Sequence, residues 1–296
     1  MAAGRGTRLR PWTDTIPKPL LPIAGRGTLL RTFDALPSVI DEVIVVVGYL
    51  QEQIRVELGE TYAGKRVTYV VQDPLDGTGG ALRRVESLVR DEPFFILNGD
   101  DLYSRKDLES MCKHSRSILV CRKQITSKND TWKVKDGHVC ELSTSPAGSE
   151  VLVNAGAYVL GHEWFETTPV LVPGKTDEWS LPHAIPQILS RVPHIAIEAT
   201  YWQPCGTPEE VQVAERLITS WQFFCLEGPW CQNFTHKMSR AMRAPVCMIT
   251  CGCCLRISIK ILSARAIEKK MSAARYSPRT IEKIGMDPES QRLAAK

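Results

Sequence analysis

The stretch that decides the fold is residues 1–25, MAAGRGTRLRPWTDTIPKPLLPIAG. Gly4 and Gly6 flank an arginine, and glycines at this spacing allow a sharp turn that points backbone N–H groups at an anion. Prolines at positions 11, 17, 19 and 22 prevent a helix from starting directly after this turn, and we expect them to hold Lys18 on an extended segment. The stretch therefore predicts a phosphate-binding loop that presents Arg8 and Lys18 to the same ligand.

Two other glycine motifs fit this stretch less well. A dinucleotide-binding loop needs a third glycine followed at once by a helix, but this chain has Leu9 at that position and Pro11 soon after it. A P-loop needs Gly-Lys-Ser or Gly-Lys-Thr, which Gly6-Thr7-Arg8 is not. A flexible terminus without a ligand remains the alternative, and the stiff Pro-Lys-Pro segment argues against it.

The opening stretch resembles the signature of the sugar-1-phosphate nucleotidyltransferases, which runs Gly-x-Gly-Thr-Arg-Leu, then Pro, Thr and Pro-Lys-Pro. The matching residues are Gly4, Gly6, Thr7, Arg8, Leu9, Pro11, Thr13, Pro17, Lys18 and Pro19. Further matches extend the resemblance over about residues 1–221, which we expect to form the nucleotidyltransferase domain. Family members carry an apolar strand before this loop, whereas this chain begins with Met1 inside it, so we expect that first strand to be missing.

Strands and helices alternate over the first hundred residues. Strands are predicted at residues 43–47, 67–71 and 94–97 and helices at 28–36, 51–58 and 78–89. Unbroken β-branched runs are typical of strands buried on both faces of a parallel sheet. We therefore predict an α/β fold with a doubly wound, mostly parallel, Rossmann-like sheet.

A β-rich insertion is predicted to follow, where a sugar could bind. It comprises a strand at 117–122, a hairpin at 132–142 that turns at Asp136-Gly137, and a strand at 151–160. Residues 180–190 have helical spacing with a kink at Pro186, and residues 194–202 read as a strand. A final helix is expected to start after Thr207, with proline and Glu210 completing its N-terminal capping pattern.

Acidic residues stand at the end of the strand predicted at 94–97. Ligands of open α/β sheets bind at the carboxyl ends of the strands, and one carboxylate plus phosphate and water oxygens can hold Mg²⁺. The resemblance implies that Asp100 is the magnesium ligand, and we expect Asp101 to be solvated. The alternative is an acidic surface turn without a metal.

The resemblance also implies where the base and the sugar bind. Gln72 with the following Gly-Thr-x-x-Ala pattern would receive the base, so the implied nucleotide contacts are Ala3, Gly4, Gly6, Thr7, Gln72, Gly77 and Thr78. A glutamine amide both donates and accepts, as a base edge requires; alternatively Thr78 simply caps the next helix. Asn154 and Gly156 resemble the sugar-pocket strand, although Asn154 could instead bond a neighbouring strand.

Two positions depart from the family pattern. Trp202-Gln-Pro-Cys-Gly-Thr207 resembles Trp-x-Asp-x-Gly-Thr, whose aspartate is a second metal ligand, but this chain has Pro204 there. The family's Glu-Lys-Pro is replaced by residues 144–146, Thr-Ser-Pro. Because proline has no side-chain oxygen, we expect weaker metal binding, with Gln203 as a possible substitute ligand.

Charge and cysteines set residues 222–296 apart as a basic tail to which we assign no fold. Residues 229–296 hold 13 Lys or Arg against 4 Asp or Glu, and six of the ten cysteines lie between Cys225 and Cys254. Their spacings fit no common zinc pattern, and a basic nucleic-acid or membrane contact is a further alternative. No signal peptide or transmembrane helix is expected, so we predict a cytoplasmic protein without membrane or nucleic-acid partners that can form a homo-oligomer.

The resemblance implies an enzyme. A sugar 1-phosphate oxygen would attack the α-phosphorus of a nucleoside triphosphate, with Arg8 and Lys18 as catalytic residues and Mg²⁺ as cofactor. No general base is needed, because a phosphate monoester is already ionised near neutral pH. The alternative is a non-catalytic subunit, or a degenerate family member, that binds a nucleotide sugar, which Pro204 would suit. The base loop looks most like those of guanylyl- and uridylyl-transferring relatives.

Overall fold

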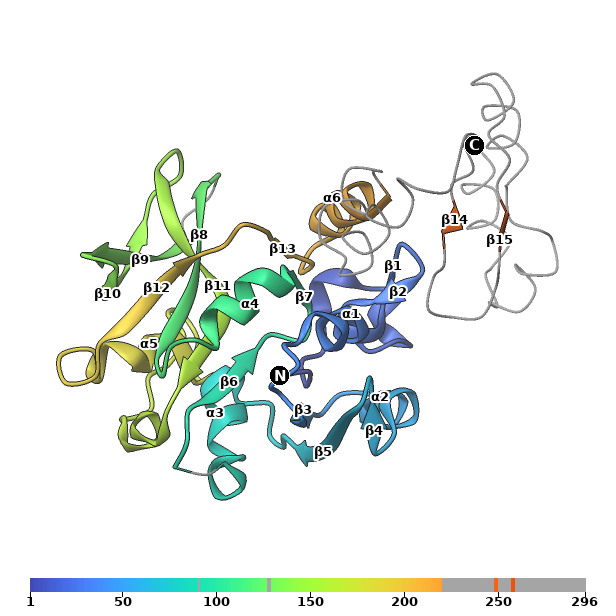
Figure 1. Cartoon of the computed structure of the whole chain (residues 1–296), viewed down its shortest axis with the longest axis horizontal. Helices are drawn as coiled ribbons and strands as arrows, with labels where there is room; N and C mark the ends of the chain where they lie inside the picture. Colours follow the sequence, from blue (N-terminus) through green and yellow to red (C-terminus); the bar gives the residue numbers. More distant parts are fainter. Residues whose placement is uncertain (90, 127–128, 220–247, 250–256, 259–296) are drawn as a thin grey trace, which may run out of the picture. The chain divides into compact units, whose positions relative to one another are not determined.

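The computed structural model describes residues 1–89, 91–126 and 129–219, together with residues 248–249 and 257–258 (Figure 1). The chain separates into two units, Met1–Cys231 and Gln232–Lys296. Of the second unit, only the antiparallel pair β14 (Met248–Ile249) and β15 (Ile257–Ser258) belongs to the described residues. The predicted basic tail, with its cysteines, otherwise lies outside them, so its role stays open.

A three-stranded sheet forms the first part of the fold. β3 (Glu42–Val47) and β5 (Lys65–Val71) pair in parallel, and the short β4 (Thr61–Tyr62) adds to β5 in antiparallel register. The helices α1 (Thr28–Ala35) and α2 (Gln51–Leu58) supply apolar side chains to the same core cluster as β3. The strands and helices predicted from residue 28 to residue 71 are confirmed.

The larger sheet has six strands in the order β6-β11-β8-β12-β10-β9. Its strands are β6 (Phe94–Leu97), β8 (Ser117–Gln124), β9 (Asn129–Lys135), β10 (His138–Ser145), β11 (Glu150–Leu160) and β12 (His194–Glu198). Only the β8–β12 pairing is parallel. The prediction of a mostly parallel sheet is therefore wrong for this part of the chain, because β11 inserts antiparallel between β6 and β8 and the β9–β10 hairpin adds antiparallel neighbours.

The first two residues lie between the two sheets. Ala2 forms a parallel bridge with Val47 of β3, and its backbone N–H donates to the carbonyl of Val46 at 2.8 Å. The amino group of Met1 donates to the carbonyl of Leu97 in β6, also at 2.8 Å. Figure 1 marks this end of the chain beside β3 and β6. The predicted phosphate loop therefore starts where the two sheets approach each other.

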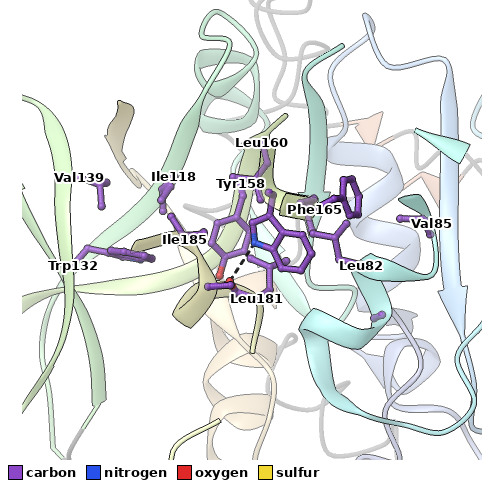
Figure 2. Close-up of a cluster of buried hydrophobic side chains, with 14 of the residues drawn as sticks. Leu82, Val85, Ile118, Trp132, Val139, Tyr158, Leu160, Phe165, Leu181 and Ile185 are labelled. Carbon is purple, nitrogen blue, oxygen red and sulfur yellow. Dashed lines mark hydrogen bonds between the residues drawn. The ribbon is translucent and has the colours of Figure 1, made fainter. Parts of the chain in front are cut away.

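The largest core cluster joins the six-stranded sheet to the helices that cover it. Figure 2 shows this cluster, with Tyr158 of β11 and Leu181 near its centre and Trp132 and Val85 towards opposite ends. Trp164, in the 3-10 turn η5 (His162–Glu166), donates its indole N–H to the carbonyl of Leu181 at 3.4 Å. The cluster thus fixes the segment around residue 181 against the sheet.

Short elements complete the fold and differ in places from the predicted ones. The helix expected at 78–89 is α3 (Gly77–Arg83) followed by the 3-10 turn η4 (Glu86–Leu88), and the strand expected at 194–202 is divided between β12 and β13 (Trp202–Pro204). The kink predicted at Pro186 separates α5 (Leu181–Ala184) from η6 (Ile185–Gln187). The remaining elements are η1 (Thr7–Leu9), η2 (Trp12–Asp14), η3 (Lys18–Leu20), β1 (Pro22–Ile23), β2 (Arg26–Gly27), β7 (Asp101–Tyr103), α4 (Arg105–Met111) and α6 (Pro208–Thr219).

The start of α6 has the predicted capping arrangement. The Glu210 backbone N–H donates to Thr207 Oγ1 at 3.3 Å, and the Thr207 backbone N–H donates to Glu210 Oε2 at 3.0 Å. Ala214 and Ile218 form its buried stripe. No helix in the described part of the chain is long and apolar enough to cross a membrane.

Candidate functional site

The glycine loop has the sharp turn that its sequence predicts. Gly6 adopts φ +64°, in the left-handed region, and η1 follows it with Leu9 buried. Thr13 Oγ1 donates to the Gly6 carbonyl at 2.8 Å. A Cβ on Gly6 would lie 3.0 Å from Lys18 Cβ, so the turn packs directly against the segment that carries Lys18.

Arg8 lies at the outer side of this loop. It is exposed, and a Cβ on Gly206 would lie 2.9 Å from Arg8 Nη2 and 3.1 Å from Glu210 Oε2. The same Glu210 oxygen accepts the Gly206 backbone N–H at 2.7 Å. The guanidinium group therefore rests beside the start of α6 while it stays accessible to an anion.

Lys18 and Asp100 form an ion pair between side chains that are 82 residues apart in the chain. The Lys18 side chain is 12% exposed and that of Asp100 is 28% exposed. Lys18 begins the 3-10 turn η3, so the prediction of an extended segment is wrong: Pro17 is extended, but the backbone turns at once after it. The pair connects the phosphate loop to the end of β6.

Asp101 is 6% exposed, and the expectation that it is solvated is wrong. It begins β7 rather than a surface turn, and its Oδ2 accepts hydrogen bonds from Asn98 Nδ2 (3.4 Å), Tyr103 Oη (3.4 Å) and Trp202 Nε1 (3.3 Å). Burial and the neighbouring Asp100 charge raise its pKa to about 7, which the Lys18 charge and the donated hydrogen bonds partly oppose.

Pro204 faces this buried carboxyl group. β13 pairs with β7 in antiparallel register, with Pro204 directly opposite Asp101. Gln203, the proposed substitute ligand, donates its side-chain amide to the Pro204 carbonyl at 2.7 Å. Within the described residues no group of three or more His, Cys, Asp or Glu side chains is arranged to hold a metal ion.

The predicted base-binding residues come together in one loop. Gln72 is 5% exposed, and its Nε2 donates to Asp76 Oδ1 (2.9 Å) and to the Gly77 carbonyl (2.8 Å). Thr78 Oγ1 accepts the Leu181 backbone N–H at 3.0 Å, and the helix cap is Asp76 rather than Thr78. The glutamine amide N–H group thus holds the loop in shape.

Asp76 is held as a carboxylate in this loop. Arg84 Nη1 lies 2.8 Å from Asp76 Oδ1. Burial would raise the pKa of Asp76, but the hydrogen bonds from Gln72 and Arg84 and the Arg84 charge lower it below its usual value. Gly77 adopts φ +87°, and a Cβ there would lie 2.8 Å from the Trp179 backbone nitrogen. The loop is therefore built around close backbone contacts that exclude a larger residue.

The predicted base loop and the predicted phosphate loop are neighbours. The Ala3 carbonyl accepts the Tyr49 backbone N–H at 3.1 Å, and a Cβ on Gly48 would lie 3.0 Å from the same carbonyl oxygen. Gln72, in turn, donates its backbone N–H to the carbonyl of Val47 at 2.7 Å. Ala3 is buried, whereas Gly4 and Thr7 are exposed and face outward from the turn.

Asn154 and Gly156 lie at an irregularity of β11, where the register against β8 shifts between Asn154 and Tyr158. The Asn154 amide bonds Tyr158 Oη at 2.7 Å and accepts from Trp132 Nε1 at 3.2 Å. Gly156 adopts φ +68°, and a Cβ there would overlap the side-chain amide of Asn98. Since Asn98 also bonds Asp101, the predicted sugar strand contacts the acidic end of β6.

Sequence reasoning missed the aromatic partners of Asn154, namely Trp132 and Tyr158. Burial and the nearby Asp101 charge raise the pKa of Tyr158, so it stays a neutral hydroxyl at the Asn154 amide. Two surface hollows of about 440 and 460 Å³ lie elsewhere, one beside α6 and one between β10 and η6, and no predicted site residue lines either.

Comparison with known proteins gives one family. The family model described as nucleotidyl transferase matches residues 1–220. The chain is 28% identical over 224 residues to the bifunctional protein GlmU of Methanocaldococcus jannaschii, covering 74% of this chain and 53% of that protein. It therefore spans about half the length of this curated relative.

Two further similarities cover most of the other protein. UTP–glucose-1-phosphate uridylyltransferase AglF of Haloferax volcanii is 28% identical over 231 residues, which is 74% of this chain and 94% of that one. The crystal structure of a putative glucose-1-phosphate thymidylyltransferase from Bacillus anthracis superposes with a TM-score of 0.63 at 22% identity, covering 75% of this chain and 96% of that one. The second similarity indicates a shared fold.

Proposed function

The chain belongs to the nucleotidyl transferase family, and we propose that residues 1–221 transfer a nucleoside monophosphate from a nucleoside triphosphate to a sugar 1-phosphate, with release of pyrophosphate. The observation that carries this proposal is the contact between Lys18 and Asp100 beside the turn at Gly6. The ammonium group of Lys18 and the carboxylate of Asp100 lie together there. A reaction between two phosphate groups requires fixed charged groups of this kind, because they align the substrates and stabilise the charge of the transition state.

The proposed reaction needs alignment and charge stabilisation more than proton transfer. An oxygen of the sugar 1-phosphate attacks the α-phosphorus, a new P–O bond forms, and the bond to the pyrophosphate oxygen breaks. The partly buried Lys18 ammonium would donate to the phosphate oxygens between the two substrates. The exposed Arg8 guanidinium would bind the triphosphate tail and the departing pyrophosphate, for which its planar fork is suited.

The side chains at the end of β6 fit a magnesium ion held mainly by its substrates. Asp100 and Asp101 are adjacent carboxyl groups with one lysine nearby, and Asp100 is the more exposed of the two. Asp100 would be the protein ligand, while phosphate and water oxygens supply the other positions. Bound there, Mg²⁺ would neutralise charge on the phosphates. Pro204 gives no second carboxylate, so weak metal affinity in the absence of nucleotide is expected.

The nucleotide and sugar contacts follow from the two loops and β11. We propose that the backbone of Ala3, Gly4, Gly6 and Thr7 binds the phosphates and that Gln72, Gly77 and Thr78 border the base. Asn154 and Gly156 would border the sugar, supported by the contact of Gly156 with Asn98. The name of the Haloferax relative is consistent with a uridylyl transfer, and guanylyl transfer is the other candidate.

We further propose that the two sheets are parts of one Rossmann-like arrangement. The support is the position of Ala2, which bridges β3 in parallel, and of Met1, which bonds Leu97 of β6.

Pyrophosphate release tests the proposed reaction. Purified full-length protein, shown to be folded by circular dichroism, is incubated with Mg²⁺ and a panel of nucleoside triphosphates and sugar 1-phosphates. We expect pyrophosphate with at least one pair of substrates, and a rate about 100- to 1000-fold lower when Lys18 is replaced by methionine. If the folded protein released no pyrophosphate with any pair of substrates, the proposed reaction would be refuted.

A nucleotide-sugar-binding protein without turnover is the second candidate, and Pro204 opposite Asp101 is the observation that favours it. Calorimetry would then record binding of a nucleotide sugar while no pyrophosphate forms. Pro204→Asp distinguishes the two cases, because activity gained in this variant would identify an enzyme weakened by its metal site.

A further inference from the structure

Asp130, Trp132 and Asn154 lie on one face of the pairing between β9 and β11. Val153 pairs with Thr131 in antiparallel register, which sets Asn154 opposite Asp130. Directly opposed residues point to the same side of a sheet. The hydrogen bond from Trp132 Nε1 to Asn154 Oδ1 agrees with this, since alternate residues of a strand share a face. A carboxylate therefore neighbours the amide of the proposed sugar strand.

The helix α5 brings His183 to the same place. Ser180 Oγ accepts the His183 backbone N–H at 3.3 Å and lies 2.7 Å from the ring Nδ1. In the tautomer in which the Ser180 hydroxyl donates to Nδ1, the ring proton lies on Nε2. His183 Nε2 lies 3.6 Å from Asp130 Oδ2.

The segment that carries His183 also touches the proposed base loop. The Leu181 backbone N–H, one residue after the cap, donates to Thr78 Oγ1. Leu181 itself is fully buried in the core cluster shown in Figure 2. The contacts of Ser180 and Leu181 thus hold His183 between the proposed base loop and the proposed sugar strand. Its position does not depend on a bound ligand.

The geometry of the pair suits a hydroxyl group. A separation of 3.6 Å is too long for a hydrogen bond between Nε2 and Oδ2. One group donates and the other accepts, and a hydroxyl does both at once, so a single hydroxyl can bond to the two of them. The side chains are 18% and 35% exposed, which leaves them accessible. Ser180, by contrast, is 3% exposed, and its hydroxyl bonds the ring and the backbone of His183.

We infer that Asp130 and His183 together bind one hydroxyl group of the sugar, and so contribute to sugar selectivity. This inference rests on the proposed function and adds to it two residues outside the loops and β11. It also names the substrate class: a sugar 1-phosphate with a free hydroxyl directed at this pair, since a sugar lacking it would leave a charged acceptor without a partner.

Steady-state kinetics of full-length variants test the inference. Asp130→Ala and His183→Gln should raise KM for the sugar 1-phosphate by about 10- to 100-fold, as expected for a hydrogen bond to a charged group, while KM for the nucleoside triphosphate stays unchanged. Asp130→Asn, which retains an acceptor oxygen, should recover part of the loss. Glu141→Gln is the matched control, because Glu141 pairs with Lys133 on the exposed side of the same hairpin.

A series of monodeoxy sugar 1-phosphates gives the sharper readout. With the unmodified protein one analogue, lacking the bound hydroxyl, should have a KM raised by the same factor as in Asp130→Ala. With Asp130→Ala the difference in KM between that analogue and the parent sugar should be smaller than with the unmodified protein. If every analogue raised KM by the same factor in Asp130→Ala as in the unmodified protein, the inference would be overturned.

The outcomes separate the two proposals. If the unmodified protein is active and Asp130→Ala leaves KM for the sugar unchanged, the inference is wrong and the proposed reaction stands. Equal rises in both KM values would also overturn it, since they would indicate a structural role. If the unmodified folded protein is inactive with every substrate pair, the proposed reaction fails and the inference fails with it.

Discussion

Gly156→Ala perturbs the point where the proposed sugar strand meets the acidic end of β6. Gly156 has φ +68°, and a Cβ at this position would overlap the Asn98 amide nitrogen and lie 2.8 Å from Asn98 Cγ. Asn98 cannot move freely, because its backbone N–H donates to the Gly156 carbonyl at 3.0 Å and its side chain bonds Asp101. The alanine variant is therefore destabilised both by its left-handed backbone conformation and by the overlap of its side chain with Asn98.

The expected loss has two parts. Alanine in the left-handed region costs about 1–2 kcal/mol, of which about 0.4–1 kcal/mol is returned because the unfolded chain has fewer conformations. Overpacking against Asn98 adds about 1–3 kcal/mol. Gly156→Ala should thus lower the free energy of unfolding by about 2–4 kcal/mol. Gly174→Ala is the matched control, because Gly174 has φ +80° but nothing within 4 Å of its Cβ position.

Urea unfolding of both variants, followed by circular dichroism, measures the difference. Gly174→Ala should cost about 1 kcal/mol, and the excess for Gly156→Ala should shrink when Asn98→Ala is combined with it, since the smaller side chain removes the overlap. If Gly156→Ala costs no more than Gly174→Ala, the contact between β11 and the end of β6 is not as described and the proposed sugar site loses its support.

Three further predictions concern charge. Lys18→Met should lower kcat by about 100- to 1000-fold, because the developing phosphate charge loses its donor; pyrophosphate assays check this, and the exposed Lys133→Met should leave kcat unchanged. Pro204→Asp should tighten Mn²⁺ binding, followed by electron paramagnetic resonance, and unaltered affinity would argue against a metal at Asp100. The third prediction is that the contribution of His194 to stability falls as the pH is lowered from 7 to 5, because burial lowers the pKa of His194 below its usual value and the unfolded chain takes up the proton first, whereas Asp101, with its pKa raised to about 7, contributes in the opposite direction. Thermal unfolding of His194→Asn should therefore lose less stability, or gain more, than the unmodified protein between pH 7 and pH 5, and an identical pH dependence of the two proteins would refute the role of His194.

Local chemistry explains which elements could be predicted. The strand at residues 43–47 is an unbroken β-branched run, and the turn at Asp136-Gly137 has positive φ at both residues, so each is specified by neighbours along the chain. The direction of strand pairing was mispredicted, because β11 pairs with β6 and β8 from distant parts of the sequence and no local pattern records which neighbour a strand will choose.

The candidate site likewise contains some features that could be predicted from the sequence and others that could not. Asp100 and Asp101 are consecutive and chemically identical, yet one is ion-paired near the surface and the other is buried under Trp202, since β7 starts between them. Burial of a side chain depends on what packs over it, and Trp202, which bonds Asp101, comes from the other end of the domain. The sequence therefore had no means of separating the two carboxylates.

By itself the sequence determined the turn at Gly6, the strands and helices around it and the capped final helix, because glycine, proline and β-branched residues restrict the backbone where they stand. Only the tertiary structure decided that Lys18 meets Asp100, that Pro204 lies opposite Asp101 and that His183 faces Asp130. These contacts join residues 53 or more positions apart, and the energy that selects them comes from packing the whole domain at once rather than from any single segment.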